Sequence, residues 1–137
     1  MNITLIIPAL NELNLDRLIA SVPDIGDRLH IIVIDDGSKE RLRKYDDDRR
    51  VKIVRHPYTI GNGAAIKTGI RAAKGDVLVF MDGDHSFSAA DLPHLLVPIL
   101  EDHADLVLGS RELGHMAQGA MPPHQRFGNW MVSRLMN

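Results

Sequence analysis

The sequence of 137 residues contains no cysteine. This absence excludes disulfide bridges, thiolate zinc sites and cysteine nucleophiles, and it suits a protein of the reducing cytoplasm. The sequence also has little excess charge, with a net charge of -2 and an isoelectric point near 6.4. Domains that bind nucleic acid typically carry a basic face, so we expect no nucleic-acid partner.

Long hydrophobic runs are absent as well. The longest apolar stretch, residues 92–100, is interrupted by Pro93, His94 and Pro98. A membrane-spanning helix needs roughly 18 or more apolar residues, so no span is predicted. Residues 3–7 read as an apolar strand with no basic segment before it, which does not resemble a signal peptide. We therefore expect a cytoplasmic protein.

Several catalytic motifs are missing too. The sequence has no Gly-x-Ser-x-Gly elbow for a serine nucleophile, and no pair of histidines spaced as in helical zinc sites. The glycine-rich segment that begins at Gly61 lacks the Gly-Lys-Ser/Thr end of a P-loop and does not match the dinucleotide fingerprint. The sequence therefore shows no residue pattern that would support nucleophilic hydrolysis or zinc-protease chemistry.

The chain does show alternating strand-like and helical segments. Continuous apolar runs predict strands covered on both faces, at residues 3–7, 30–34, 51–54, 77–81 and 106–108. Helical patterns lie at residues 14–22, 39–45, 61–73, 89–102 and 126–136, with a kink expected at Pro98. This order predicts an α/β fold in one domain, with a mostly parallel sheet flanked by helices. Ligands of such sheets bind beyond the carboxyl ends of the strands, at a switch point.

The most informative motif is Asp82-Gly83-Asp84, which directly follows an apolar strand. Residues at i and i+2 of an extended segment point the same way, and carboxylate oxygens suit Mg²⁺ or Mn²⁺ held together with substrate phosphates. Gly83 would let a phosphate or sugar approach the backbone. Asp-Gly-Asp is also a common turn sequence after a strand. The choice between a metal site and an ordinary turn therefore depends on other segments of the chain.

Other strand ends carry polar residues of the same kind. Asp35 and Asp36 close a second strand, where they could bind a base or ribose or could cap a helix. Residues 8–12 combine a strand end with Asn and Glu. Residues 61–67 begin a predicted helix, where they could bind an anion or could pack the helix closely on the sheet. Arg111 could contact a phosphate or could form a surface salt bridge.

Taken in order, residues 8–12, 34–38, 61–76, 81–84 and 109–111 resemble the family-2 glycosyltransferases of the GT-A fold. The likeness is greatest to the dolichyl-phosphate mannose synthase type and to bacterial polyprenyl-phosphate glycosyltransferases, and it covers most of residues 2–130. It implies a single family-2 domain over residues 1–137.

The resemblance also implies roles for individual residues. The residues that would line the nucleotide pocket are Pro8, Leu10, Glu12, Ile34 and Asp36. Asp82 and Gly83 would contact the nucleotide sugar. Asp84 would hold Mg²⁺ or Mn²⁺ with help from Ser86, and Arg111 would contact the diphosphate. Asp84 and Arg111 are thus the predicted catalytic residues.

Three features depart from the family pattern. The segment after Asp84 leaves the second metal ligand open, and Leu10 stands where many synthases have a tyrosine that stacks on the base. Family domains usually extend beyond a point equivalent to Asn137, which suggests C-terminal truncation of the acceptor-binding part. We expect this chain to bind the donor with little transfer on its own.

The predicted activity is transfer of a sugar from a GDP- or UDP-sugar to a dolichyl or polyprenyl phosphate at the cytoplasmic face of a membrane. One alternative is a sugar-phosphate nucleotidyltransferase, which would need a glycine-rich basic loop where residues 8–12 stand. The other is a non-catalytic fragment that only binds the nucleotide.

Overall fold

The computed structural model describes residues 1–26, 28–42, 45, 49–84 and 86–110. In chain order the elements are β1 (Ile3–Ala9), α1 (Leu15–Ser21), β2 (Leu29–Asp35), β3 (Val51–Arg55), α2 (Asn62–Ala72), β4 (Val77–Phe80), the short 3₁₀ helix η1 (Ala89–Asp91) and α3 (Leu92–Leu100). This order confirms the predicted alternation of strands and helices except between β2 and β3, where the described residues form no helix.

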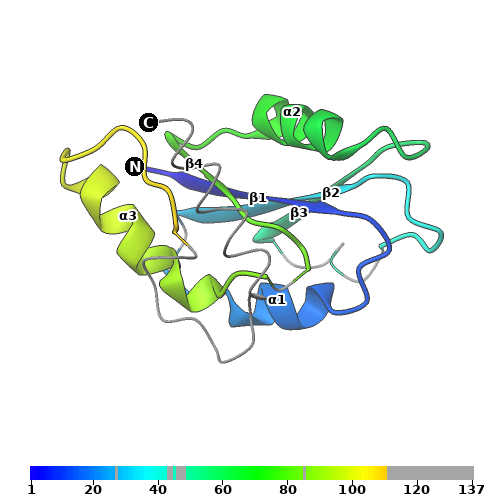
Figure 1. Ribbon diagram of the computed structural model, residues 1–137, viewed down its shortest axis with the longest axis horizontal. Helices are drawn as coiled ribbons and strands as arrows, with labels where there is room; N and C mark the ends of the chain where they lie inside the picture. Colours follow the sequence, from blue (N-terminus) through cyan, green and yellow to red (C-terminus); the bar gives the residue numbers. More distant parts are fainter. Residues whose placement is uncertain (27, 43–44, 46–48, 85, 111–137) are drawn as a thin grey trace, which may run out of the picture. The chain divides into compact units, whose positions relative to one another are not determined.

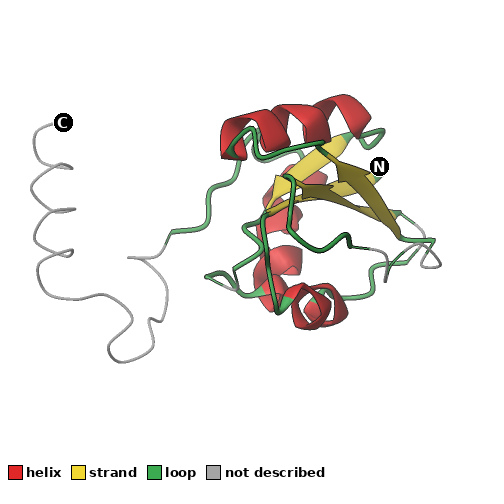
Figure 2. Cartoon of the chain, turned by 90° about the vertical axis from the view of Figure 1, so that its right-hand side faces the viewer, coloured by secondary structure: helices red, strands yellow, loops and turns green. Residues whose placement is uncertain are grey.

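The strands form one parallel sheet in the order β3-β2-β1-β4. Helix α2 covers one face of the sheet, and α1 and α3 cover the other, as Figures 1 and 2 show. Leu5 and Ile7 of β1 pack with the α1 and α3 side, whereas Ile6 packs with Ala65 on the α2 side. Burial on both faces explains why the strand sequences are continuously apolar.

Strand β1 lies between β2 and β4 in the sheet. The chain passes first from β1 to β2 on one side, and it reaches β4 on the other side only after β3. The β1–β2 connection contains α1, and the β3–β4 connection contains α2 on the opposite face. The ends of β2, β1 and β4 therefore meet at a topological switch point, where α/β sheets bind their ligands.

Strand β1 extends two residues farther than predicted, through Pro8 and Ala9. The carbonyl of Ala9 accepts a hydrogen bond from the Asp36 N–H beside β2, whereas that of Ile6 accepts one from Met81 beside β4. Alternation along a strand makes Pro8 face the β4 side, where pairing has ended at Phe80. The missing proline N–H thus removes no ladder hydrogen bond.

Two predicted elements are wrong in the part of the chain that the structure describes. Residues 39–42 and 45 form no helix. This short segment is mostly charged, and Tyr45 is buried with its hydroxyl donating to Asp16 of α1, so tertiary contacts outweigh a marginal helix. Residues 106–108 form no strand, because a strand depends on a paired neighbour more than on three apolar residues.

The fourth predicted helix is divided, with η1 before α3, and Pro98 lies inside α3. The helix ends at Leu100, and Asp102 beyond it has a positive φ of 54°. Among the described residues, no helix is both long and apolar enough to cross a membrane.

The chain divides into two compact units, residues 1–105 and 106–137. Of the second unit the structure describes residues 106–110, which have no regular secondary structure. The helix predicted at residues 126–136 lies outside the described residues, as does Arg111.

The packing of α2 on β1 depends on Gly69, because a Cβ there would overlap Cγ2 of Ile6. We expect Gly69→Ala to lower the free energy of unfolding by about 1–3 kcal/mol, as overpacking of a core does. Gly63→Ala is the matched control in the same helix, since its Cβ would meet no atom within 4 Å. Urea unfolding of both variants checks this, and equal stability of the two would contradict the close packing.

Candidate functional site

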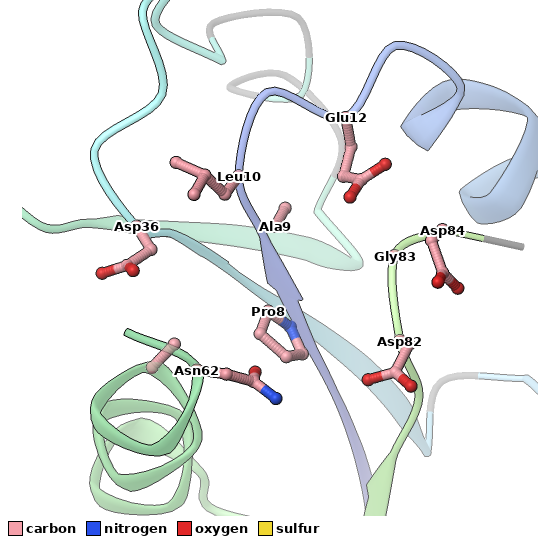
Figure 3. Close-up of a pocket in the computed structure, with 10 residues that line it drawn as sticks. Pro8, Ala9, Leu10, Glu12, Asp36, Asn62, Asp82, Gly83 and Asp84 are labelled. Atoms are coloured by element: carbon pink, nitrogen blue, oxygen red, sulfur yellow. The ribbon is translucent and has the colours of Figure 1, made fainter. Parts of the chain in front are cut away.

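A pocket of about 210 Å³ lies at the carboxyl ends of β1, β2 and β4 and at the start of α2 (Figure 3). Its lining residues are Pro8, Ala9, Leu10, Glu12, Asp36, Asn62, Ala65, Asp82, Gly83 and Asp84. The pocket therefore occupies the switch point of the sheet, and four of its lining side chains are carboxylates.

Most of the residues predicted for the site line this pocket, and two described ones do not. Ile34 is completely buried in the core beside Ile6 and Ala65, so its side chain supports the pocket without lining it. Ser86 lies next to the pocket and donates its backbone N–H to Oδ1 of Asp84 over 2.9 Å. Arg111 lies outside the described residues, so its predicted role is untested.

The carboxylates fall into two groups on either side of the β1 end. Figure 3 shows Asp36 on one side, with Glu12, Asp82 and Asp84 on the other. This division follows from the sheet order, because β2 and β4 flank β1. The pocket thus offers two separated polar ends to an elongated ligand.

Gly83 brings the β4 end close to the β1 end. A Cβ at this position would lie 3.1 Å from the carbonyl oxygen of Pro8 and 3.3 Å from Cγ of Glu12. A larger residue would have to push these groups aside. Glycine therefore allows the chain to place Asp82 and Asp84 next to the loop that carries Glu12.

Asp36 is buried, and its carboxylate accepts three hydrogen bonds. Oδ1 accepts from Nδ1 of His56 at 2.6 Å and from the Ile60 N–H at 3.0 Å, and Oδ2 accepts from the Gly61 N–H at 2.8 Å. Burial alone raises the pKa of Asp36, but the bonds from His56, Ile60 and Gly61 outweigh it and hold the pKa below its usual value. Asp36 is therefore ionised at neutral pH.

A carboxylate has about four acceptor positions, so the three bonds leave Asp36 roughly one position, on Oδ2. Because Asp36 also lines the pocket, that position can accept from one N–H or O–H of a ligand.

Asp35, the neighbour of Asp36, has a structural role. It is fully buried, forms an ion pair with Arg55 and accepts the Ser38 N–H at 2.8 Å. Nη2 of Arg55 also donates to the Ser38 carbonyl at 2.7 Å. Successive strand residues point to opposite faces, so only Asp36 reaches the pocket.

Asn11 joins the loop after β1 to the loop after β2. Its N–H donates to Oγ of Ser38 at 2.9 Å, and its side-chain oxygen accepts from the Lys39 N–H at 2.8 Å. Its φ of 55° is left-handed, a conformation that asparagine tolerates better than most residues. These bonds hold the adjacent Leu10 at the pocket.

Sequence reasoning considered Ala9, Asn62 and Ala65 only as parts of the candidate segments 8–12 and 61–67 and gave none of them an individual role. Asn62 opens α2 directly after Gly61, whose φ of 115° suits glycine, and its side chain points toward Pro8 in Figure 3. The sequence contained a clue to the position of Asn62, because Gly61 was recognised as the start of a helix. The burial of Ala65 against the sheet was expected, but its position beneath the pocket needed the structure.

The described residues include no group of three or more His, Cys, Asp and Glu side chains arranged as a metal cage. The donor set nevertheless suits Mg²⁺ or Mn²⁺, because Asp82 and Asp84 present carboxylates at the pocket and such ions often take their other ligands from water and substrate phosphates. Asp84, with Asp82 beside it, is the group that would hold the ion.

Comparison with curated proteins identifies relatives that act on lipid phosphates. The chain is 34% identical over 149 residues to an undecaprenyl-phosphate mannosyltransferase of Micrococcus luteus, covering 99% of this chain and 55% of the relative. It is 27% identical to a UDP-N-acetylglucosamine–dolichyl-phosphate N-acetylglucosaminyltransferase of Methanococcus voltae, covering 96% of this chain and 60% of that one. The chain thus spans little more than half the length of these relatives.

Solved structures share the fold. A mannosyltransferase from Pyrobaculum calidifontis in complex with GDP-Man and Mn²⁺ aligns with a TM-score of 0.54 at 26% identity, over 61% of this chain and 27% of that one. Glucosyl-3-phosphoglycerate synthase from Mycobacterium tuberculosis, in complex with Mn²⁺, UDP and glucosyl-3-phosphoglycerate, aligns with a TM-score of 0.57 at 29% identity, over 72% and 39%. The predicted GT-A fold is confirmed.

The lowered pKa of Asp36 predicts a pH-dependent stability. A folded-state pKa below the usual 3.8 contributes stability that is present above that pH and is lost as pH falls through the folded pKa. We expect Asp36→Asn to lower the free energy of unfolding at pH 7 by about 1–3 kcal/mol, and the deficit to shrink below about pH 4. Urea unfolding from pH 7 to pH 2 measures this, with the exposed Asp91→Asn as control. A deficit independent of pH would contradict it.

The family comparison agrees with the fold. A model of glycosyl transferase family 2 matches residues 4–137, nearly the whole chain. The chain belongs to glycosyl transferase family 2.

Proposed function

We propose that the protein transfers a sugar from a nucleoside diphosphate sugar to a lipid-linked phosphate. The observation that carries the proposal is the two-ended pocket at the switch point, with Asp36 on one side of β1 and Asp82 and Asp84 on the other. The solved neighbours bound to GDP-Man or UDP together with Mn²⁺ support the same ligand class.

The two ends of the pocket suit the two ends of the donor. The open acceptor position of Asp36 would take one donor group of the base or ribose. The diphosphate would lie toward Asp82 and Asp84, which line the pocket on either side of Gly83 in the sequence. Like charges repel, so a dianionic diphosphate can approach these carboxylates only with a cation between them.

In the transfer, the bond between the anomeric carbon and the diphosphate oxygen breaks, and its electron pair leaves with the nucleoside diphosphate. A new bond forms from a phosphate oxygen of the acceptor to the anomeric carbon. A bound Mg²⁺ or Mn²⁺ would neutralise charge on the departing diphosphate. Asp84 would orient that end of the donor, and Arg111 is the predicted cation for the same phosphates.

The acceptor is inferred from chemistry and from the relatives. A polyprenyl phosphate is already an anionic nucleophile and needs no general base, whereas a sugar hydroxyl needs one within hydrogen-bond reach. The relatives named for undecaprenyl and dolichyl phosphate support a lipid acceptor. Such an acceptor would bring the protein to a membrane surface.

The nucleotidyltransferase alternative is less consistent with the site. The loop after β1 contains Leu10, Asn11 and Glu12 and has no glycine or basic residue up to Asn14. Glu12 lines the pocket, where a nucleotidyltransferase would need to cradle a triphosphate. A carboxylate there would repel that substrate.

Asp84→Ala should remove the effect of Mn²⁺ on nucleotide binding, because this exposed carboxylate is proposed to supply metal affinity and contributes little to the core. We expect calorimetry with UDP and GDP to show that Mn²⁺ tightens binding by about tenfold or more in the unaltered protein, equivalent to ~1.4 kcal/mol, but not in the variant. Asp91→Ala, an exposed carboxylate outside the pocket, should retain the Mn²⁺ effect. A folded Asp84→Ala protein with the full Mn²⁺ effect would overturn the metal assignment.

A transfer assay separates the remaining alternatives. The protein is incubated with Mn²⁺, a radiolabelled UDP- or GDP-sugar and either undecaprenyl phosphate in detergent or soluble 3-phosphoglycerate. If the label becomes extractable into organic solvent only when the lipid phosphate is present, the result supports the proposed acceptor. Donor binding without transfer to either acceptor supports the alternative of a chain that binds the nucleotide but does not catalyse transfer by itself.

A further inference from the structure

His56 directly follows β3 and contacts both the pocket carboxylate and helix α2. Its side chain is buried, with Nδ1 2.6 Å from Oδ1 of Asp36 and Nε2 2.9 Å from Oγ1 of Thr68. Its backbone N–H donates to the Asp35 carbonyl at 2.8 Å. Strand end, carboxylate and helix are thus connected through one imidazole ring.

The contact with Asp36 determines which ring nitrogen carries a proton. An ionised carboxylate can only accept, so Nδ1 of His56 must be the donor. Nε2 can then accept from the Thr68 hydroxyl or, in the charged ring, donate to it. Because both ring edges are engaged, the ring cannot rotate without losing a hydrogen bond on one side.

The other two donors to Asp36 come from a more exposed segment. The backbone amides of Ile60 and Gly61 belong to the β3–α2 loop, in which Tyr58 is 68% and Ile60 51% exposed. His56 lies at the strand end and is only 7% exposed. The imidazole is therefore the donor to Asp36 that is most firmly held by the rest of the structure.

We propose that His56 is a positioning residue that orients Asp36 so that its one open acceptor position faces the nucleoside part of the ligand. The inference rests on the proposed function, since it assumes a nucleoside at the Asp36 end of the pocket. His56 does not line the pocket and would act only through Asp36. Its loss should therefore affect recognition of the nucleoside and leave the diphosphate end unchanged.

Two substitutions separate the bonds that His56 makes. An asparagine amide nitrogen occupies nearly the place of Nδ1, so His56→Asn can still donate to Asp36 but cannot reach Thr68. A glutamine amide nitrogen occupies nearly the place of Nε2, so His56→Gln can reach Thr68 but loses Asp36. Thr68→Val removes the hydroxyl that contacts Nε2 of His56, with little change in the shape of the side chain.

The measurement is calorimetry of each variant with UDP or GDP, whichever the unaltered protein binds more tightly, and with the matching nucleoside. Inorganic pyrophosphate with Mn²⁺ probes the other end of the pocket. We expect His56→Gln to weaken nucleotide and nucleoside binding by about tenfold, as loss of a hydrogen bond to a charged group does. His56→Asn and Thr68→Val should stay within about twofold, and pyrophosphate binding should not change.

A purely structural role predicts a different pattern. If His56 only fills space, the Asn and Gln variants should lose affinity to the same extent, and pyrophosphate binding should fall as well. That result, or unchanged nucleoside affinity in a folded Gln variant, overturns the inference. If the unaltered protein binds neither nucleotide nor nucleoside, the proposed function itself fails, and the variants are not needed to show it.

A spectroscopic test keeps the inference falsifiable even if a variant does not fold. In protein labelled with ¹⁵N-histidine, the buried Nδ1–H of His56 reports on its bond to Asp36. We expect its proton resonance to shift on addition of nucleoside and not on addition of pyrophosphate with Mn²⁺. No shift at a nucleoside concentration that calorimetry shows to be saturating would count against the proposed linkage.

Discussion

The site depends on the burial of two adjacent carboxylates at the end of β2. An isolated charge inside a protein is strongly unfavourable, so each carboxylate needs its own donors. Asp35 has Arg55 and Ser38, and Asp36 has His56 and the amides that begin α2. These requirements define how β3, the loop after it and α2 must lie around the end of β2. The pocket wall on this side is therefore a consequence of satisfying two charges.

The other side of the pocket is built differently. Asp82 and Asp84 are exposed, and they are placed there by the close approach of Gly83 to Pro8. One end of the site is thus buried and largely hydrogen-bonded, while the other presents carboxylates at the surface. This contrast fits a ligand whose nucleoside needs shape-specific contacts and whose diphosphate needs charge compensation. Arg111 belongs to the same family match but lies outside the described residues.

The sequence was sufficient to predict the α/β fold, because buried parallel strands leave continuous apolar runs such as residues 3–7. It also predicted Asp36, Asp82 and Asp84 for the site, because turn-forming carboxylates at strand ends stand out from the apolar runs before them, and all three line the pocket. The residue pattern alone left Asp35 and Asp36 equivalent, and only the family resemblance favoured Asp36, since the face that each side chain takes depends on where β2 stops. Nor could it identify His56, because a lone histidine has no periodic pattern and its partners are 12 and 20 residues away. The helix expected at residues 39–45 failed because tertiary contacts decided a marginal local preference.

Pro8 has a consequence for how the sheet ends. Parallel strands tend to continue pairing for as long as donors and acceptors face each other, and after the Met81 N–H has bonded the Ile6 carbonyl the next ladder bond would need an N–H at position 8. Proline at position 8 offers β4 no N–H, so the regular pairing of the two strands ends at Phe80. Regular pairing of β1 with β4 therefore ends where a hydrogen-bond donor is missing, and a residue with an amide N–H at position 8 would favour extending it.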